Sequence, residues 1–215
     1  MIALKYQKHF PLAAVSHIDL LKDMGRVFQR MKLNVEYSQG FNPHMLYFFS
    51  PALSLGVESD CEWVVVQAPY SEDFIERFNA VACPGLLGLC ALEVPKNPNL
   101  ASAVVWARYE ATLPCIPQNG FDFVLGETLT ISYENKGETV QKDVRPMVRD
   151  FSYEGNTLCF TLACGNSNLK AERFLKGITQ IAGVPYAEKP ICKKEMYYAD
   201  GKTVWQHLTE DYIEK

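Results

Sequence analysis

At the start of the chain the spacing of hydrophobic residues changes from the alternation of a strand to the three-to-four-residue spacing of a helix. Residues 1–8 alternate apolar and polar side chains, which predicts a strand. Apolar side chains then recur at helical spacing from Leu20 to Met31, which predicts a helix with one buried face. Ser16 stands just before this helix and Asp19 follows three residues later, a pattern typical of a helix N-cap.

The same kind of pattern completes a first unit. Strands are predicted at 45–55 and 61–70, a short helix capped by Ser71 follows, and a strand at 86–94 comes last. This β-α-β-β-α-β order is the ferredoxin-like arrangement, in which two helices cover one face of a four-stranded antiparallel sheet. The other face of that sheet is left open for the rest of the chain, a second copy or a partner.

A boundary at 95–99, PKNPN, separates this unit from a second run of strands. A helix is predicted from its cap Asn168 to Gly183, which can take the left-handed conformation at a helix end. Further strands are predicted at 104–114, 128–134, 139–145, 148–154, 156–163 and 191–199. We therefore predict an α+β fold with two ferredoxin-like halves, residues 1–97 and residues 98–215. Both halves have antiparallel sheets, and the second is decorated and less regular.

Composition places the chain among ordinary folded proteins. Of its 215 residues, 48% are hydrophobic and 21% are charged, which excludes a disordered or fibrous class. No apolar stretch approaches the roughly 20 residues that cross a bilayer, and the N-terminus lacks a signal-peptide core. We expect a cytoplasmic bacterial protein without membrane contact. The net charge of -4 means that nucleic-acid binding would need a local basic patch.

The cysteines do not form a recognisable metal or cluster motif. All 7 are scattered along the chain, and no Cys-x-x-Cys pair occurs. Zinc sites and iron–sulfur clusters use closely spaced thiolates, so we expect reduced packing residues and no metal or cofactor held by this chain alone.

Three polar residues mark the start of the first helix: Ser16, His17 and Asp19. A capping pair explains Ser16 and Asp19 without any further role. At the first helical position the helix dipole disfavours imidazolium, so His17 is expected to be neutral and available as a base or a ligand. These residues are too close in sequence to work as a catalytic triad, because a nucleophile on a helix start cannot be aimed at its neighbour.

The connector behind the helix holds more turn-forming and aromatic residues than a simple link requires. Its members are Tyr37, Ser38, Gln39, Gly40, Phe41, Asn42, Pro43 and His44. We interpret it as a binding loop, with a structural turn as the alternative. We expect His17 and His44 to converge on one polar pocket. A metal site made of these two histidines and Asp19 is a weaker alternative.

Basic side chains gather in several segments. Lys22, Arg26 and Arg30 lie four apart on the polar face of the first helix. Other basic groups are Arg145 and Arg149 beside Lys142 and Asp143, then Lys170, Arg173 and Lys176, then Lys193 and Lys194. A solvated face is the default interpretation. The alternative is a phosphate-tracking surface for RNA, with stacking by Tyr37 and Phe41, if the fold brings these groups together.

These segments resemble the bacterial radical-SAM-linked protein family, a family of unknown function found alone or behind a radical SAM enzyme. The strongest matches are SHIDL at 16–20, YSQGFNPH at 37–44 and LSLGVES at 53–59. Weaker matches are DVRPMV at 143–148, NLKAERFL at 168–175 and ICKKEMYYADG at 191–201. Two positions depart from the pattern: Met45 follows His44 in place of a proline, and Lys22 replaces an arginine.

The resemblance implies an accessory protein that works with a radical SAM enzyme and presents RNA or a translation component to it. Any radical chemistry would belong to that partner, because this chain lacks the three closely spaced cysteines that hold the cluster. We expect no independent catalytic activity. One alternative is a metal-independent endoribonuclease that uses His17 as general acid or base, although the glycine-rich loop of such nucleases is missing. Another is a protein that binds a small molecule or a metal.

Overall fold

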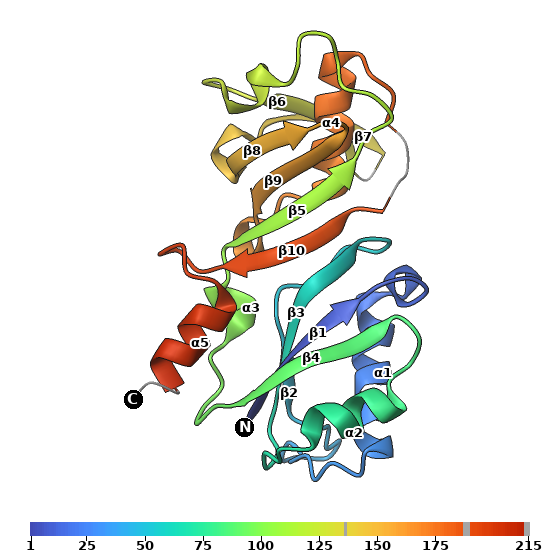
Figure 1. Cartoon of the computed structure of the whole chain (residues 1–215), viewed down its shortest axis with the longest axis vertical. Helices are drawn as coiled ribbons and strands as arrows, with labels where there is room; N and C mark the ends of the chain where they lie inside the picture. Colours follow the sequence, from blue (N-terminus) through green and yellow to red (C-terminus); the bar gives the residue numbers. More distant parts are fainter. Residues whose placement is uncertain (136, 187–189, 213–215) are drawn as a thin grey trace.

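One sheet runs through both halves of the chain (Figure 1). The computed structural model describes residues 1–135, 137–186 and 190–212. Among these residues the sheet has eight strands in the order β4-β1-β3-β10-β5-β9-β8, and β2 pairs with β3 outside this path. The strands of the first half are β1 (Ile2–Lys8), β2 (Tyr47–Phe49), β3 (Glu58–Val66) and β4 (Leu86–Glu93). Those of the second are β5 (Trp106–Thr112), β8 (Val148–Glu154), β9 (Thr157–Ala163) and β10 (Cys192–Tyr197).

The first half forms as its hydrophobic pattern predicts. Helix α1 (His17–Arg30) begins at the predicted cap, where Ser16 Oγ accepts a hydrogen bond from the Asp19 amide at 3.2 Å. Such a cap stabilises a helix by about 1 kcal/mol. Helix α2 (Phe74–Val81) has Asp73 as its N-cap, so the predicted Ser71 cap is wrong. Both helices pack on one face of the sheet and share a buried core with β1 and β3.

The second half places one helix and one hairpin on its sheet. Helix α4 (Ala171–Ala182) ends at Gly183, which has the predicted left-handed conformation with a φ of 67°. Its N-cap is Lys170 and not the predicted Asn168. The hairpin is formed by β6 (Thr130–Asn135) and β7 (Glu138–Asp143). A Cβ on Gly177 would lie 2.6 Å from Ile131, so α4 and β6 are in close contact there.

Two helices that the pattern did not predict connect the halves. Helix α3 (Leu100–Ala103) follows the first unit, and α5 (Val204–Tyr212) lies near the end of the chain. Trp205 of α5 packs against Trp63 of β3, with ring centroids 6.5 Å apart. Helix α5 therefore covers the face of the first half's sheet that the sequence left open (Figure 1). None of the described helices combines the length and the apolar character that a membrane crossing requires.

The two halves meet where β3 and β10 run side by side. This pairing is parallel and short, joining Cys192 to Glu58 and Lys193 to Ser59. Lys193 also forms an ion pair with Glu62 of β3, with Nζ 2.5 Å from Oε1. Neighbouring strands are otherwise antiparallel, so the predicted α+β class with antiparallel pairing is confirmed. The division at residue 97 stays a prediction, since one buried core includes residues from both sides of it.

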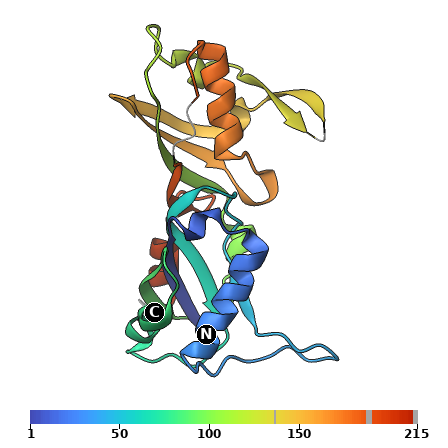
Figure 2. The same cartoon turned by 90° about the vertical axis from the view of Figure 1, so that its right-hand side faces the viewer.

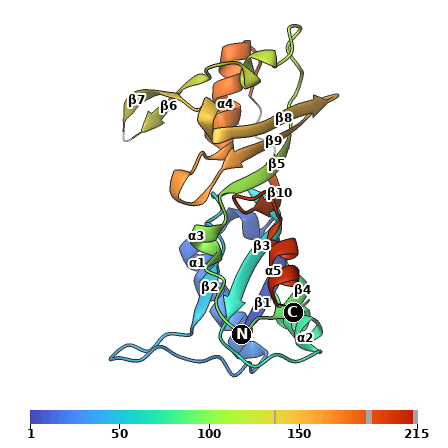
Figure 3. The ribbon, with the colours of Figure 1, turned by 90° about the vertical axis from the view of Figure 1, so that its left-hand side faces the viewer.

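Residues 36–46, which we call the arm, project from the far end of α1. Figures 2 and 3 show this segment extending away from the body in two views from opposite sides. An isolated bridge between Tyr37 and Met45 closes its base. Above it, the amide of Ser38 donates to His44 O at 2.9 Å, and Ser38 Oγ lies 2.8 Å from His44 Nδ1. The arm is thus a braced hairpin rather than a loose connection.

The buried Lys193–Glu62 pair is expected to hold the junction. Removal of one partner leaves an uncompensated buried charge, so Lys193→Met or Glu62→Leu should lower the free energy of unfolding by about 3–5 kcal/mol. The double variant should recover part of this loss, because the two paired charges are removed together while the buried Lys8 loses the attraction of Glu62. Urea unfolding of the single and double variants measures this cycle. Lys22→Met, which removes an exposed pair with Asp19, is the control and should cost less than about 1 kcal/mol.

Candidate functional site

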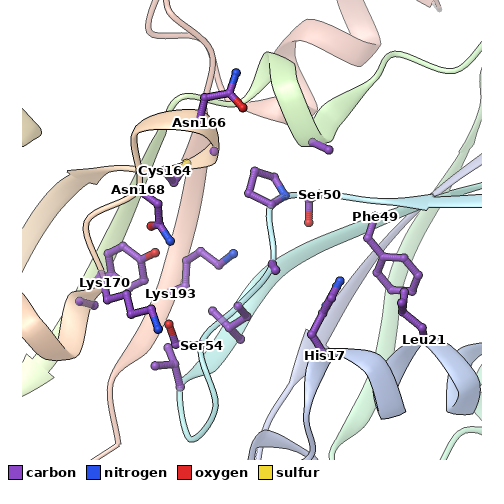
Figure 4. A pocket seen from close by; sticks show the side chains of 18 of the residues that line it. His17, Leu21, Phe49, Ser50, Ser54, Cys164, Asn166, Asn168, Lys170 and Lys193 are labelled. Atoms are coloured by element: carbon purple, nitrogen blue, oxygen red, sulfur yellow. The ribbon is translucent and has the colours of Figure 1, made fainter. Parts of the chain in front are cut away.

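A cavity of about 470 Å³ lies between the two halves, and we call it the junction cavity (Figure 4). His17 and Leu21 of α1 form one wall, and residues 50–54 between β2 and β3 form another. The opposite wall is the segment 164–170 between β9 and α4. Lys193 of β10 also lines the space, so both halves of the chain contribute residues to this site.

Lys193 lines the cavity, and two further buried charged groups, Lys8 and Glu62, do not line it but interact electrostatically with His17, which does. Lys193, Lys8 and Glu62 are 2%, 1% and 4% exposed. Glu62 is paired with Lys193 and accepts a hydrogen bond from Ser50 Oγ at 3.4 Å. Lys8 Nζ donates to the carbonyl oxygen of Val15 at 3.0 Å. The three groups together carry an excess positive charge, which an anion in the cavity could balance.

Electrostatics around the two lysines differ. Burial lowers the pKa of Lys193, but the Glu62 carboxylate together with Tyr109 and Cys61 outweighs that effect, so the pKa lies above its ordinary value. Burial also lowers the pKa of Lys8, and there the attraction of Glu62 does not compensate. Lys193 is therefore firmly cationic. The repulsion between the two ammonium groups contributes to the lowered pKa of Lys8.

His17 points from the first residue of α1 toward the cavity (Figure 4). Its ring meets Phe49 edge to face, with centroids 5.7 Å apart. Burial lowers the pKa of His17, the Glu62 carboxylate opposes this, and the Lys8 and Lys193 ammonium groups lower it further. The imidazole is therefore neutral near pH 7, as the sequence predicted, and it can donate or accept a hydrogen bond without adding charge.

The N-termini of two helices also border the cavity. His17 opens α1, and Lys170 with Ala171 opens α4. The Lys170 side chain makes no capping hydrogen bond, so the first amides of α4 lack that partner. Free amides and the positive end of the helix dipole favour anions. Gly165 lies in the same wall with a φ of 69°, and a Cβ there would lie 2.8 Å from Val104 O, so only glycine fits this turn.

Ser16 and Asp19 have a local role. Ser16 Oγ donates to Asp19 Oδ2 at 2.8 Å, and Lys22 Nζ lies 3.2 Å from Asp19 Oδ1. The hydrogen bonds from Ser16 and Lys22 lower the pKa of Asp19. Both residues are exposed and neither lines the junction cavity. The contacts of Ser16 and Asp19 are therefore those expected of a helix-capping pair.

The expected convergence of His17 with the connector is wrong. The arm that carries residues 37–44 leaves the opposite end of α1, a helix of 14 residues that spans about 20 Å (Figure 2). Phe41 at its tip is completely exposed, and His44 is held by Ser38. His17, Asp19 and His44 consequently do not form a metal site. No group of three or more metal-ligating side chains occurs among the residues that the structure describes.

The other predicted basic residues divide into separate groups. Arg26 pairs with Asp23 at 2.8 Å, as Lys22 does with Asp19, so two charges of the α1 stripe are partly neutralised, while Arg30 ends the helix. Asp143 and Arg145 instead build a turn. Asp143 Oδ1 accepts from the amides of Leu129 and Arg145, and the Arg145 guanidinium donates to the carbonyl oxygens of Gly126 and Val148.

Lys8 and Glu62 were not predicted as site residues, although a signal for them exists. Lys8 continues the inward alternation of Ile2, Leu4 and Tyr6, which are all fully buried. Glu62 likewise shares its face with Val64 and Val66. A charged residue in the inward positions of a strand is costly unless it is paired, so such a residue indicates a partner elsewhere. The sequence alone does not identify that partner as Lys193.

Comparison with known proteins gives a family but no activity. Residues 1–171 match the family described as "Uncharacterized protein conserved in bacteria (DUF2344)", and the chain belongs to this family. The match includes the wall residues of the junction cavity up to Ala171 and excludes β10. No curated protein matches the chain.

The lowered pKa of His17 should be visible in solution. We expect its imidazole resonances in an NMR titration to change with a midpoint below the usual value of 6.5. Because the folded protein holds this proton less tightly than the unfolded chain, the stability from this group is full above about pH 6.5 and falls as the pH drops below it. His17→Gln should reduce this pH dependence of unfolding. A midpoint at or above 6.5 would contradict the electrostatic description.

Proposed function

We propose that this DUF2344 protein binds an anionic substrate in the junction cavity and presents it to a partner enzyme. The observation that carries this proposal is the excess of buried positive charge formed by Lys8 and Lys193 against Glu62. Lys170 adds an exposed ammonium group at the rim, and the start of α4 adds amide donors. Neutral donors such as Asn166 and Asn168 line the same wall and suit phosphate or carboxylate oxygens.

We propose RNA as the substrate class. A protein with a net charge of -4 does not attract a polyanion through its overall field, so the attraction must come from a local site. The cavity provides such a site, and the aromatic side chains of Tyr47, Phe49 and Tyr109 in its lining can contact bases. The phosphate oxygens would bind the lysine ammonium groups, and the bases would pack against the apolar wall.

The proposed partner is a radical SAM enzyme, which would supply the iron–sulfur cluster and the radical chemistry. Support comes from the resemblance carried by residues 16–20 and 37–44. The arm also favours a protein partner, because Phe41 is fully exposed and the only Asp, Glu, Lys or Arg between Lys32 and Glu58 is Glu36. An uncharged aromatic tip suits an apolar pocket on another protein better than a phosphate backbone.

We further propose that both halves are ferredoxin-like units. In the first half the strand order is β4-β1-β3-β2, with α1 between β1 and β2 and α2 between β3 and β4. The order β10-β5-β9-β8 repeats this arrangement, with α4 between β9 and β10. In place of the first helix, the second half has a 3-10 turn, Asp122–Leu125, and the β6–β7 hairpin. The two sheets would then be duplicates joined edge to edge.

A second candidate function is RNA cleavage by His17. The observation that favours it is a neutral imidazole beside the buried lysines, since a neutral histidine can remove a proton from a ribose hydroxyl. Lys193 would then stabilise the phosphate during the reaction. Substrate binding requires only that these residues contact the RNA, whereas cleavage also requires His17 to transfer a proton. Binding is therefore the first proposal.

Filter binding tests the first proposal. A single-stranded RNA should bind at about 50 mM salt and bind about tenfold more weakly at about 200 mM, because each phosphate contact releases counterions. Lys170→Ala should weaken binding several-fold without loss of stability, since Lys170 is exposed. Lys96→Ala removes an equally exposed charge outside the cavity and serves as the control. The absence of binding at low salt would refute RNA as the substrate.

Incubation of the protein with labelled RNA tests the second candidate. If His17 acts as general acid or base, cleavage should occur without added metal and should fall by about 10²-fold or more in His17→Ala. If binding is the function, the RNA should stay intact with the unmodified protein. A cleavage rate that is the same in both proteins would exclude the proposed role of His17.

A further inference from the structure

A second polar cavity, of about 600 Å³, lies between α4 and the β6–β7 hairpin, and we call it the hairpin groove. Lys170 lines both this groove and the junction cavity, so the two spaces share one wall residue. The floor of the groove is the exposed side of α4, where Arg173 and Lys176 follow Lys170 at intervals of three residues. Ser132 and Thr139 of the hairpin bring hydroxyl groups to the other side.

The charges of the groove favour an anion, because its lining has three basic residues, Lys170, Arg173 and Lys176, against two acidic ones, Glu134 and Glu172. Glu172 is engaged by Lys176, with Nζ 2.7 Å from Oε1. Among the described residues, Lys170 and Arg173 form no ion pair with a carboxylate. Arg173 instead lies over the ring of Tyr133, 4.5 Å from its centroid. A guanidinium stacked on an aromatic ring offers both a phosphate contact and a flat surface for an unpaired base.

The groove is also preorganised. Gly177 on α4 faces Ile131 on β6 so closely that a Cβ would lie 2.6 Å away, which holds the hairpin against the helix. The hairpin and α4 lie side by side in two views (Figures 1 and 3). A ligand that enters the groove therefore meets fixed walls and loses less free energy in ordering them.

From this arrangement we infer that the substrate is a single-stranded oligonucleotide that continues from the junction cavity over Lys170 into the hairpin groove. This inference rests on the proposed RNA binding and specifies its extent. One phosphate is held by Lys193 and the start of α4, and a later phosphate is held by Arg173. A mononucleotide occupies the junction cavity alone, whereas a longer strand also uses the groove. Single strands suit the site because their bases are free to stack on Tyr133.

Affinity measured against strand length tests this inference. The probes are uridine monophosphate and the corresponding di-, tetra- and octanucleotides, measured by isothermal titration calorimetry with the full chain. Arg173→Ala should leave the mononucleotide affinity within about twofold and weaken the octanucleotide about tenfold. It should also lower the salt slope of octanucleotide binding by about 0.7, the change expected for one lost phosphate contact. Lys170→Ala should weaken both probes, and Lys96→Ala neither.

A second variant guards against a folding defect in the first. Thr139 is exposed on the hairpin, so Thr139→Glu adds a negative charge to the groove without removing a packed side chain. It should weaken the octanucleotide and leave the mononucleotide unchanged. Equal affinity of the octanucleotide for the unmodified protein and for both groove variants would overturn the inference while leaving RNA binding intact. Failure of every oligonucleotide to bind the unmodified protein would refute the proposed function and the inference together.

Discussion

The ion pair between Lys193 and Glu62 joins the two halves of the protein at the point where their backbone contact is least extensive. Strands β3 and β10 share only two residue pairs, so hydrogen bonds between them contribute little to the junction. The side-chain pair crosses the same point and is almost completely buried. Burial of two charges is unfavourable unless their geometry is good, and this cost makes the relative position of the strands specific.

The same pair determines the chemistry of the junction cavity. Lys8 comes from β1, and its charge is not cancelled because Glu62 already serves Lys193. Burial lowers the pKa of His17 and the two ammonium groups lower it further, and their excess positive charge suits the cavity to an anion. The N-termini of α1 and α4 both border the cavity, so their first backbone amides are directed toward the same space. Lys193 and Glu62 thus hold the two halves together and also set the charge of the proposed binding cavity.

The arm and the cavity divide the molecule into two surfaces of different character. The cavity is polar and cationic and lies between the halves, whereas the arm is uncharged at its tip and lies at the other end of α1. Hydrogen bonds between Ser38 and His44 brace the arm behind its aromatic tip. The separation of the arm from the cavity would let the proposed protein partner on the arm and the proposed anionic substrate in the cavity bind at the same time.

The sequence by itself determined the local structure of this protein. Hydrophobic periods identified β1, α1, β4 and α4, because each depends on residues that lie close together along the chain. Ser16 and Gly183 revealed the ends of two helices for the same reason. The pattern predicts a strand at 45–55, but β2 is only Tyr47–Phe49, since its length depends on its pairing with β3. Helix α5 escaped prediction, because it is stabilised by Trp63, far away in sequence.

Only the tertiary structure decided which polar residues share a site. His17 and His44 are near in sequence but lie at opposite ends of a helix, whereas His17 and Lys193 are distant in sequence and line one cavity. The pairing of β3 with β10 creates this contact, and no local pattern encodes that pairing. Lys8 and Glu62 carried a signal of burial, but the identity of the partner depended on the register between strands from two halves of the chain.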